Sequence, residues 1–382
     1  MNVQIITAHN IEGSAELTQQ RQAVVQSPLQ RFAEHILRAF SALAALAIFA
    51  TTADAASRES DQNTAPDDRV LQVQLFLDAS AFKPGVIDGR WGEFTRKALV
   101  RYEQAQGREG VHYGEKPPAQ FDLPIDATKP TRTTYRLTPD DQQFIGSVPE
   151  GPVAQSKVKS LPYADFLELL GEKFHATREF LRQINPGYDW STAKPGDDVQ
   201  VPNVATPFSV QEAMDMKANG KKSKQDGKTA EAGKAKAPNT EDKKSENEQY
   251  SIQVDVTEEM LELSQNGKLV GSYPITPGSE SLPAPKGEWF IKGMTWMPTF
   301  RCDKAMLLNG KRSDDAHELP PGPNNPVGIL WMQLNRDGIG LHGTSDPETI
   351  GRSTSHGCIR LANWDALDLG KKVLPGVKVT IR

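Results

Sequence analysis

The middle of the chain contains a long segment that cannot belong to a hydrophobic core. Residues 211–248 are mainly Lys, Glu, Ala, Gly and Ser, with almost no large apolar side chain and with both charge signs in near balance. Such a segment buries too little apolar surface to offset the entropy lost on ordering it. A chain of 382 residues is also too long for one ordinary domain. We therefore predict a disordered linker over 208–248, which lets the folded units on its two sides move independently.

The composition excludes several classes of function. The net charge is −5 and no basic stripe interleaved with aromatic residues is present, so we expect no nucleic-acid partner. The 2 cysteines, Cys302 and Cys358, are too few for a disulfide scaffold or a multi-cysteine zinc site. We expect no metal, no organic cofactor and a monomeric protein.

The N-terminal region has the features of an export signal. Arg31 and Arg38 lie in a basic flank, and an uncharged apolar run follows from Ala39 to Ala53. This run is shorter than the roughly 20 residues that span a bilayer as a helix, which favours a signal over a membrane anchor. Ala53-Asp54-Ala55 then fits an A-x-A cleavage pattern. No cysteine lies near this site, which excludes lipid attachment there.

We predict that residues 1–55 are an export segment and that the protein acts in the periplasm or cell envelope. A buried amphipathic helix is the alternative for this region. The stretch before Arg31 is long for a signal peptide, so the true translation start is open.

Residues 68–107 are predicted to form a small helical unit. Leu71 and Leu75 share one helical face, and a second helix begins near Glu93. The segment between the helices is rich in turn signals and reads Pro84-Gly85-Val86-Ile87-Asp88-Gly89-Arg90-Trp91-Gly92. This order of elements resembles the small helical peptidoglycan-binding domain of cell-wall enzymes. A generic helical hairpin is the alternative.

Residues 157–203 are predicted to form a second small unit, after an extended connector with little core over 108–155. Two stretches carry apolar side chains at helical spacing: Phe166, Leu169, Leu170 and Phe174, then Phe180, Leu181 and Ile184. Asn185-Pro186-Gly187 and Lys194-Pro195-Gly196-Asp197, with the strand Val199-Gln200-Val201-Pro202, resemble a LysM module, in which two helices pack on a small sheet. The usual first strand has no good match before Tyr163, so a merely structural copy is the alternative.

Residues 249–382 are predicted to be mostly β-structure with one or two short helices. Apolar residues alternate on either side of Asn266-Gly267, which is a strong signal for a type I′ hairpin. The segment from Ile339 to His342 is typical of a buried strand, and Asn363 is a good N-cap for a helix. We therefore expect a multidomain protein in which a sandwich- or barrel-like β-domain follows the two smaller units.

One cluster in this domain has the chemistry of acyl transfer. The thiol of Cys358 becomes a nucleophile when a base takes its proton, and His342, at the end of a predicted strand, is a candidate base. His356 can orient the loop or the substrate. Gly357 lets a substrate backbone approach and leaves amide N–H groups free for an oxyanion. The planar guanidinium of Arg360 suits a carboxylate.

These residues resemble the YkuD-type L,D-transpeptidase family, with an ErfK/YbiS-like catalytic domain, over essentially all of 249–382. The matching motifs are Ile339-Gly340-Leu341-His342-Gly343-Thr344, Ser355-His356-Gly357-Cys358-Ile359-Arg360-Leu361 and Pro323-Asn324-Asn325-Pro326-Val327-Gly328.

The resemblance implies a nucleophilic Cys358 and a general base and acid in His342. It implies that His356 and Gly357 shape the oxyanion and donor site. It also implies a substrate-binding role for four residues: Arg360, Ser355, Gly343 and Thr344. The family attacks the stem tetrapeptide of peptidoglycan after the L-centre of its diamino acid, releases D-alanine and passes the acyl group to an amine.

The acceptor is open: a stem peptide, giving a 3→3 crosslink, an amine of an envelope protein, or water, giving an L,D-carboxypeptidase or amidase. A catalytically silent wall-binding protein is a further alternative. A zinc site made of His342, His356 and Cys358 is another. Cys302 is either a small core residue or a partner that forms a disulfide with Cys358 under oxidation.

Overall fold

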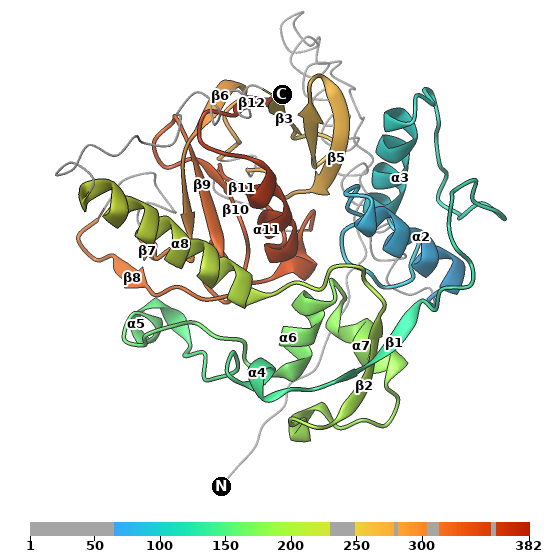
Figure 1. Ribbon diagram of the computed structural model, residues 1–382, viewed down its shortest axis with the longest axis horizontal. Helices are drawn as coiled ribbons and strands as arrows, with labels where there is room; N and C mark the ends of the chain where they lie inside the picture. Colours follow the sequence, from blue (N-terminus) through green and yellow to red (C-terminus); the bar gives the residue numbers. More distant parts are fainter. Residues whose placement is uncertain (1–64, 230–248, 279–281, 304–312, 353–356) are drawn as a thin grey trace, which may run out of the picture. The chain divides into compact units, whose positions relative to one another are not determined.

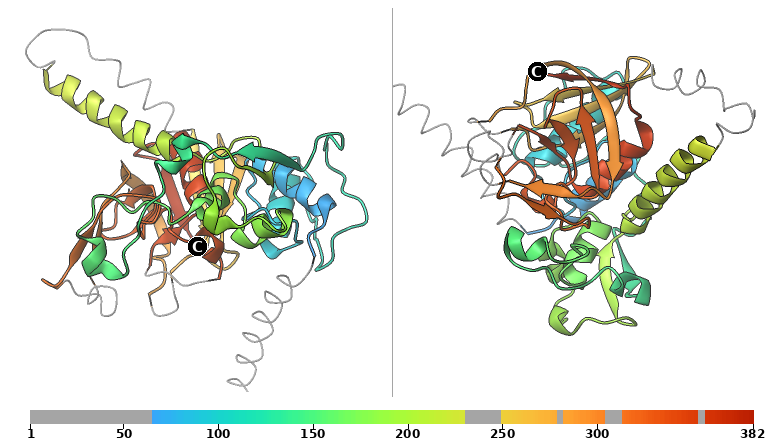
Figure 2. Two further views of the ribbon diagram at one scale, coloured as in Figure 1. Left: turned by 90° about the horizontal axis from the view of Figure 1, so that it is seen from below. Right: turned by 90° about the vertical axis from the view of Figure 1, so that its left-hand side faces the viewer.

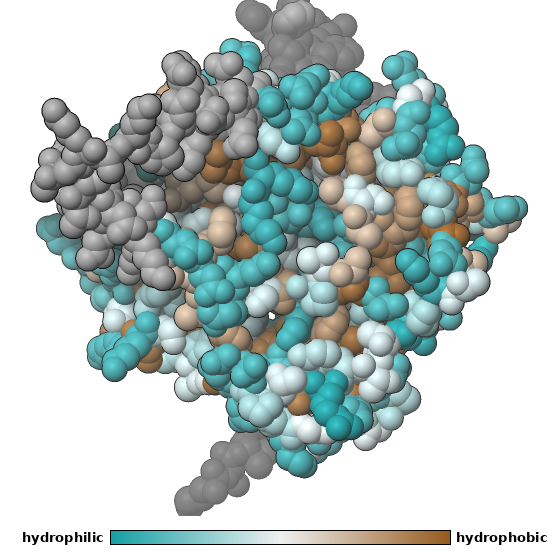
Figure 3. Space-filling model, viewed as in Figure 1, coloured by the Kyte–Doolittle hydropathy of each residue, from teal (hydrophilic) through white to brown (hydrophobic). Residues whose placement is uncertain are grey.

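The computed structural model describes residues 65–229, 249–278, 282–303, 313–352 and 357–382 (Figure 1). The export segment predicted over 1–55 lies outside these residues. Among the described helices, none combines the length and the apolar character needed to cross a membrane. On the face drawn in Figure 3, hydrophilic side chains predominate.

The two helices expected after the N-terminal region are α2 (Asp68–Ala79) and α3 (Glu93–Ala105). The buried side chain of Gln74 fixes the turn between them, because its Oε1 accepts the N–H groups of Asp88 and Gly89 at 3.1 and 2.8 Å. Gly89 has φ of +71°, a conformation that favours glycine. Whether this unit binds peptidoglycan stays a prediction.

The second unit contains the two expected helices and a small sheet. Helices α6 (Phe166–Lys173) and α7 (Arg178–Ile184) precede strand β2 (Asp198–Pro202), which pairs with β1 (Arg132–Arg136) in an antiparallel ladder. The first strand therefore lies upstream of the predicted unit, in the segment predicted to be a connector. That segment also contains the short helices α4 (Pro139–Gln142) and α5 (Gly151–Gln155). A 3₁₀ turn, η1, spans Trp190–Thr192.

The prediction of a disordered linker over 208–248 is wrong for its first half, which is helix α8 (Val210–Thr229). Val210 and Ala213 are buried, and Lys217 Nζ donates to the carbonyl of Met297 at 2.6 Å, so tertiary contacts stabilise the start of a polar helix. Figure 2 shows that α8 packs at this end and extends away toward Thr229. Residues 230–248 lie outside the described residues.

The catalytic candidate is built on one eight-stranded sheet in the order β11-β10-β9-β6-β12-β3-β4-β5. The strands are β3 (Tyr250–Asp255), β4 (Met260–Gln265), β5 (Lys268–Pro274), β6 (Gly287–Trp296), β9 (Leu330–Leu334), β10 (Gly340–His342), β11 (Ile359–Arg360) and β12 (Lys378–Ile381). Two backbone hydrogen bonds of 3.0 Å join Thr276, just after β5, to Arg360 in β11. The sheet therefore curls until its two ends meet, and the mostly-β, barrel-like prediction is confirmed in place of a two-sheet sandwich.

The predicted hairpin is present between β4 and β5, and both turn residues have positive φ, +52° at Asn266 and +76° at Gly267, as a type I′ turn requires. A separate ribbon pairs β7 (Phe300–Cys302) with β8 (His317–Leu319), and a 3₁₀ turn, η3, spans Pro347–Thr349.

Helix α11 (Asn363–Lys372) packs against β9, but its capping differs from the prediction. Ala362 holds the N-cap position and Asn363 is the first helical residue. The Asn363 side chain is turned away from the helix end because it is buried and hydrogen-bonded to other segments.

The upstream units pack against the catalytic domain, contrary to the expectation that they move independently. Beside β5, the backbones of Lys83 and Ser272 share a hydrogen bond of 2.7 Å. On the other side, Leu161 N–H donates to Pro321 at 3.0 Å and its carbonyl accepts from Asn324 at 3.1 Å. Backbone pairing of this kind requires a fixed register between the parts.

Replacing Gly322 with Ala tests this docking. Gly322 has φ of +151°, and a Cβ there would clash with the Leu161 carbonyl. We expect the free energy of unfolding to fall by about 2–4 kcal/mol in urea denaturation. The control is Gly196→Ala, whose φ is +99° but whose Cβ would meet open space. Equal losses in the two variants would show that the Leu161 contact contributes nothing.

Candidate active site

Strands β10 and β11 bring the predicted site residues together. They pair in parallel, with Leu341 opposite Ile359 and His342 opposite Arg360. Leu341 and Ile359 are fully buried in the core. Because side chains alternate along a strand, His342 and Arg360 lie on the opposite face of the sheet.

The ring of His342 is buried and is held by two contacts. It is 5% exposed, stacks on Trp331 with ring centroids 5.4 Å apart, and its Nδ1 lies 2.6 Å from the Gly343 carbonyl oxygen. A carbonyl only accepts, so Nδ1 carries the proton and Nε2 has a free lone pair. Burial lowers the pKa of His342 to about 4, and the charge of Arg360 acts in the same direction. At neutral pH, His342 is therefore a neutral base with Nε2 available.

The Cys358 thiol lies at the start of β10. Its Sγ donates to the Gly338 carbonyl at 3.4 Å. Burial raises the pKa of Cys358, while a hydrogen bond from the Gly340 backbone and the charge of Arg360 lower it. The two backbone positions that bind the thiol, Gly338 and Gly340, therefore lie four and two residues before His342, and positions 340 and 342 are about 6.6 Å apart along a strand.

The remaining predicted residues have different surroundings. Gly357 has φ of +88°, and a Cβ there would lie 3.2 Å from the Ile339 side chain, which explains glycine next to the nucleophile. Arg360 is half-buried, and burial lowers its pKa. Thr344 is buried, and its Oγ1 accepts from Asp346 N–H at 3.3 Å. Ser355 and His356 lie outside the described residues.

Gly343 does not have the open surroundings of a substrate contact. A Cβ at Gly343 or at Gly328 would clash with Oδ1 of Asn363, which also accepts from the Ile329 N–H at 3.2 Å. Sequence reasoning missed this role of Asn363, because an Asn before a helix is typical of an N-cap.

Cys302 and Cys358 are not joined in a disulfide in this structure. Cys302 ends β7, and burial together with the charge of Asp303 raises its pKa. Within the described residues no group of three or more His, Cys, Asp and Glu is arranged to hold a metal ion. His356 lies outside them, so the zinc alternative stays untested.

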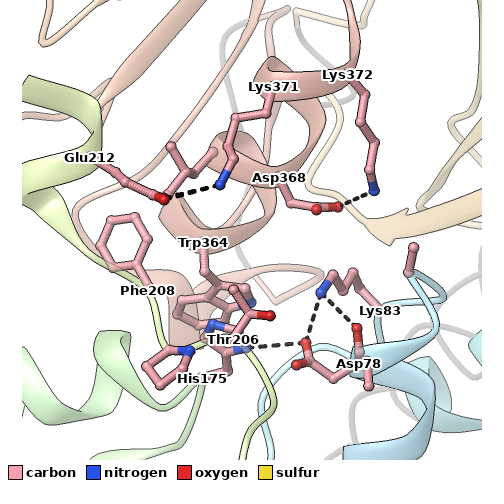
Figure 4. A pocket seen from close by; sticks show the side chains of 14 residues that line it. Asp78, Lys83, His175, Thr206, Phe208, Glu212, Trp364, Asp368, Lys371 and Lys372 are labelled. Carbon is pink, nitrogen blue, oxygen red and sulfur yellow. Dashed lines mark hydrogen bonds and ion pairs between the residues drawn. The ribbon is translucent and has the colours of Figure 1, made fainter. Parts of the chain in front are cut away.

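A charged cavity of about 180 Å³ lies where the upstream units meet α11, and it is separate from Cys358 and His342 (Figure 4). Its charges are paired with one another: Lys83 with Asp78 at 3.0 Å, Lys372 with Asp368 at 2.6 Å and Lys371 with Glu212 at 3.1 Å. The Lys371–Glu212 pair joins α11 to α8, whereas the other two pairs are local, and the cavity is not the catalytic site.

The protonation states predict the titration of Cys358. Its pKa is raised and that of His342 is lowered, so the resting pair is thiol and neutral imidazole. In a Cys302→Ser variant, which leaves one thiol, we expect thiolate absorbance to develop at a higher pH than for an ordinary exposed cysteine. A thiolate signal between pH 5 and 7 that disappears on replacing His342 would indicate an ion pair and contradict this assignment.

Comparison with known proteins gives a family match for the part of the chain that contains this site. Residues 249–381 match the family model described as YkuD, L,D-transpeptidase catalytic domain. The resemblance predicted from the sequence motifs of 249–382 is thereby confirmed. No comparison tests the resemblances predicted for the two upstream units.

Several curated proteins with L,D-transpeptidase in their names are similar to the chain. The YkuD protein of Bacillus licheniformis is 26% identical over 215 residues, 56% of this chain and 92% of that protein. The YkuD protein of Bacillus subtilis is 32% identical over 132 residues, 35% of this chain and 65% of that protein. The YbiS protein of Escherichia coli is 36% identical over 87 residues, 23% of this chain and 28% of that protein.

Among solved structures, an L,D-transpeptidase from Mycobacterium smegmatis is 18% identical, with a TM-score of 0.29. The match covers 35% of this chain and 58% of that chain.

Proposed function

We propose that this chain, whose residues 249–381 are a YkuD-type L,D-transpeptidase catalytic domain, is a cell-wall enzyme that transfers an acyl group through Cys358. The main support for the proposal is the placement of a neutral His342, with Nε2 free, on strand β10, which begins two residues after the Gly338 carbonyl that accepts from the Cys358 thiol. A thiol that is protonated at rest needs such a base to become a nucleophile.

In the first half of the reaction, Nε2 of His342 takes the proton as Sγ of Cys358 attacks the carbonyl after the L-centre of a stem tetrapeptide. The N–H groups of Gly357 and Cys358 would hold the developing oxyanion. When the carbon–nitrogen bond breaks, His342 returns the proton to the departing amine of D-alanine. The acyl group remains on Cys358 as a thioester.

In the second half, an amine attacks the thioester, its proton passes to His342, and the Cys358 sulfur leaves and is reprotonated. A stem peptide as acceptor gives a 3→3 crosslink, and an envelope protein as acceptor gives a wall-attached protein. Water as acceptor gives an L,D-carboxypeptidase. Arg360 is proposed to hold a substrate carboxylate, together with Ser355, His356 and Thr344 in the donor site.

The proposal also includes the location of the protein in the cell and its binding to peptidoglycan. Residues 1–55 would direct export to the periplasm or cell envelope, and the units at 68–107 and 157–203 would bind peptidoglycan. Because these units pack against the catalytic domain, bound wall would lie at a fixed distance from Cys358.

The test is incubation of the purified chain with a synthetic stem tetrapeptide, with and without a second stem peptide, followed by mass spectrometry of the peptides. We expect release of D-alanine and a crosslinked dimer. A tripeptide alone would assign the carboxypeptidase activity. Intact tetrapeptide in both reactions would favour the silent wall-binding alternative and overturn the proposal.

A further inference from the structure

A buried carboxyl group from the upstream part of the chain reaches into the catalytic domain. Helix α6 contacts α11, and both helices are labelled in Figure 1. Glu172 lies near the end of α6 and is 4% exposed. Its Oε1 accepts from Nδ2 of Asn363 at 2.8 Å, and the Tyr163 hydroxyl lies 2.6 Å from its Oε2. Burying a carboxyl group is unfavourable, and hydrogen bonds to both oxygens offset that loss of hydration.

The protonation state of Glu172 follows from these surroundings. Burial raises its pKa to about 8, the hydrogen bonds from Tyr163 and Asn363 lower it, and the charges of Glu168 and Asp346 raise it. At neutral pH the group is mainly the uncharged acid. Oε1 still accepts from Asn363 in that form, because the Asn363 Nδ2 group only donates.

The hydrogen bond that Asn363 donates to Glu172 orients the amide of Asn363, which is fully buried. With Nδ2 directed at Glu172, Oδ1 is directed at the Ile329 N–H, 3.2 Å away. Oδ1 also lies close to the Cα atoms of Gly328 and Gly343. A Cβ at either position would clash with Oδ1, so both positions require glycine. Rotation of this amide would place an NH₂ group against the Ile329 N–H, with no acceptor between them.

The backbone that Asn363 fixes is the backbone that orients His342. Gly343 follows His342 directly, and its carbonyl accepts the His342 Nδ1 proton at 2.6 Å. The Gly343 N–H donates to Leu330 at 3.1 Å, so one short segment carries both the sheet pairing and the histidine contact. A shift of Gly343 would therefore change the tautomer or the direction of the His342 ring.

We propose that Glu172 is a positioning residue of the active site, which acts through Asn363 and Gly343 to hold His342 as a base. The proposal rests on the acyl-transfer function proposed above. It makes the second upstream unit a part of the catalytic apparatus as well as a candidate wall-binding module. Backbone pairing of Leu161 with Pro321 and Asn324 keeps Glu172 in reach.

The test compares three variants of the full chain. Glu172→Met keeps the side-chain length and removes the Oε1 acceptor for Asn363, which leaves Nδ2 with the longer contact to the Pro323 carbonyl at 3.4 Å. Glu172→Gln keeps an acceptor for Asn363 and a donor for Tyr163. Asp141→Asn is the matched control, because Asp141 is also buried and also accepts from a tyrosine, Tyr135 at 2.7 Å, while its partners all belong to the upstream segment.

We expect Glu172→Met to lower kcat about 10- to 100-fold with KM changed less than about twofold, since small misplacement of a catalytic group has effects of this size. Glu172→Gln should retain kcat within about twofold at pH 7. Asp141→Asn should lose stability without the loss of kcat. In nitrogen NMR of His342, Glu172→Met should lose the protonated-Nδ1 signature that the wild type and Glu172→Gln retain.

A wild-type kcat and an unchanged His342 signature in Glu172→Met would overturn the proposal. Equal losses in Glu172→Met and Asp141→Asn would do the same, because they would show a general loss of stability. If Glu172→Met does not fold, Glu172→Asp, whose carboxyl is retracted from Asn363 by one methylene, should show the same losses. If the wild type forms no acyl adduct, the proposed function fails, and the NMR comparison still decides whether Glu172 holds His342.

Discussion

Replacing Cys358 with Ala should lower the rate of D-alanine release by roughly 10⁴-fold or more, because no other group in the site can form the thioester. The thiol is partly buried, and its hydrogen bond to the Gly338 carbonyl is long, at 3.4 Å, so the fold should survive the change. The measurement is D-alanine release from the stem tetrapeptide, with circular dichroism as a check of folding.

Cys302→Ser is the matched control for this variant, since it removes the other thiol of the chain and should leave turnover unchanged. Cys302 ends β7, on a ribbon separate from the eight-stranded sheet. Residual turnover in the Cys358→Ala variant near the wild-type rate would contradict covalent catalysis at this position.

Replacing His342 with Gln should lower kcat by about 10²- to 10⁴-fold at neutral pH, the range expected for loss of a general base. Gln keeps a polar side chain of similar length but has no lone pair that takes a proton at this pH. Because the pKa of Cys358 is raised, the variant should regain activity as the pH rises and thiolate forms without a base.

The wild-type pH profile gives the complementary result. The pKa of His342 is lowered to about 4, and the neutral ring is the active form, so kcat/KM should fall on acidification only as the pH nears 4. An acid limb near pH 6.5, the ordinary value for histidine, would contradict the buried neutral base. A His342→Gln variant that behaves like the wild type throughout would contradict the assigned role.

Features with a local cause were predicted well from the sequence. The turn at Asn266-Gly267 needs positive φ at both residues, and that dipeptide adopts it readily. The strand ending at His342 was recognised from its apolar run, which is long enough for a buried strand. The thiol and the imidazole were recognised because few other residue types perform this chemistry.

Features with a distant cause were missed. Strand β1 exists because Arg132–Arg136 pairs with β2, more than sixty positions later, and its own sequence has no strong strand pattern. The start of α8 is stabilised by contacts such as that of Lys217 with Met297. The links from Glu172 to Asn363 and from Asn363 to the two glycines depend on packing between separate segments, which spacing along the chain does not encode.

The most direct test of the account is the intact mass of the wild-type protein after brief incubation with the stem tetrapeptide. The account predicts an increase equal to the tetrapeptide minus D-alanine, located on Cys358 by peptide mapping and lost when an acceptor amine is added. An unchanged mass during active turnover, or an adduct on any other residue, would contradict it.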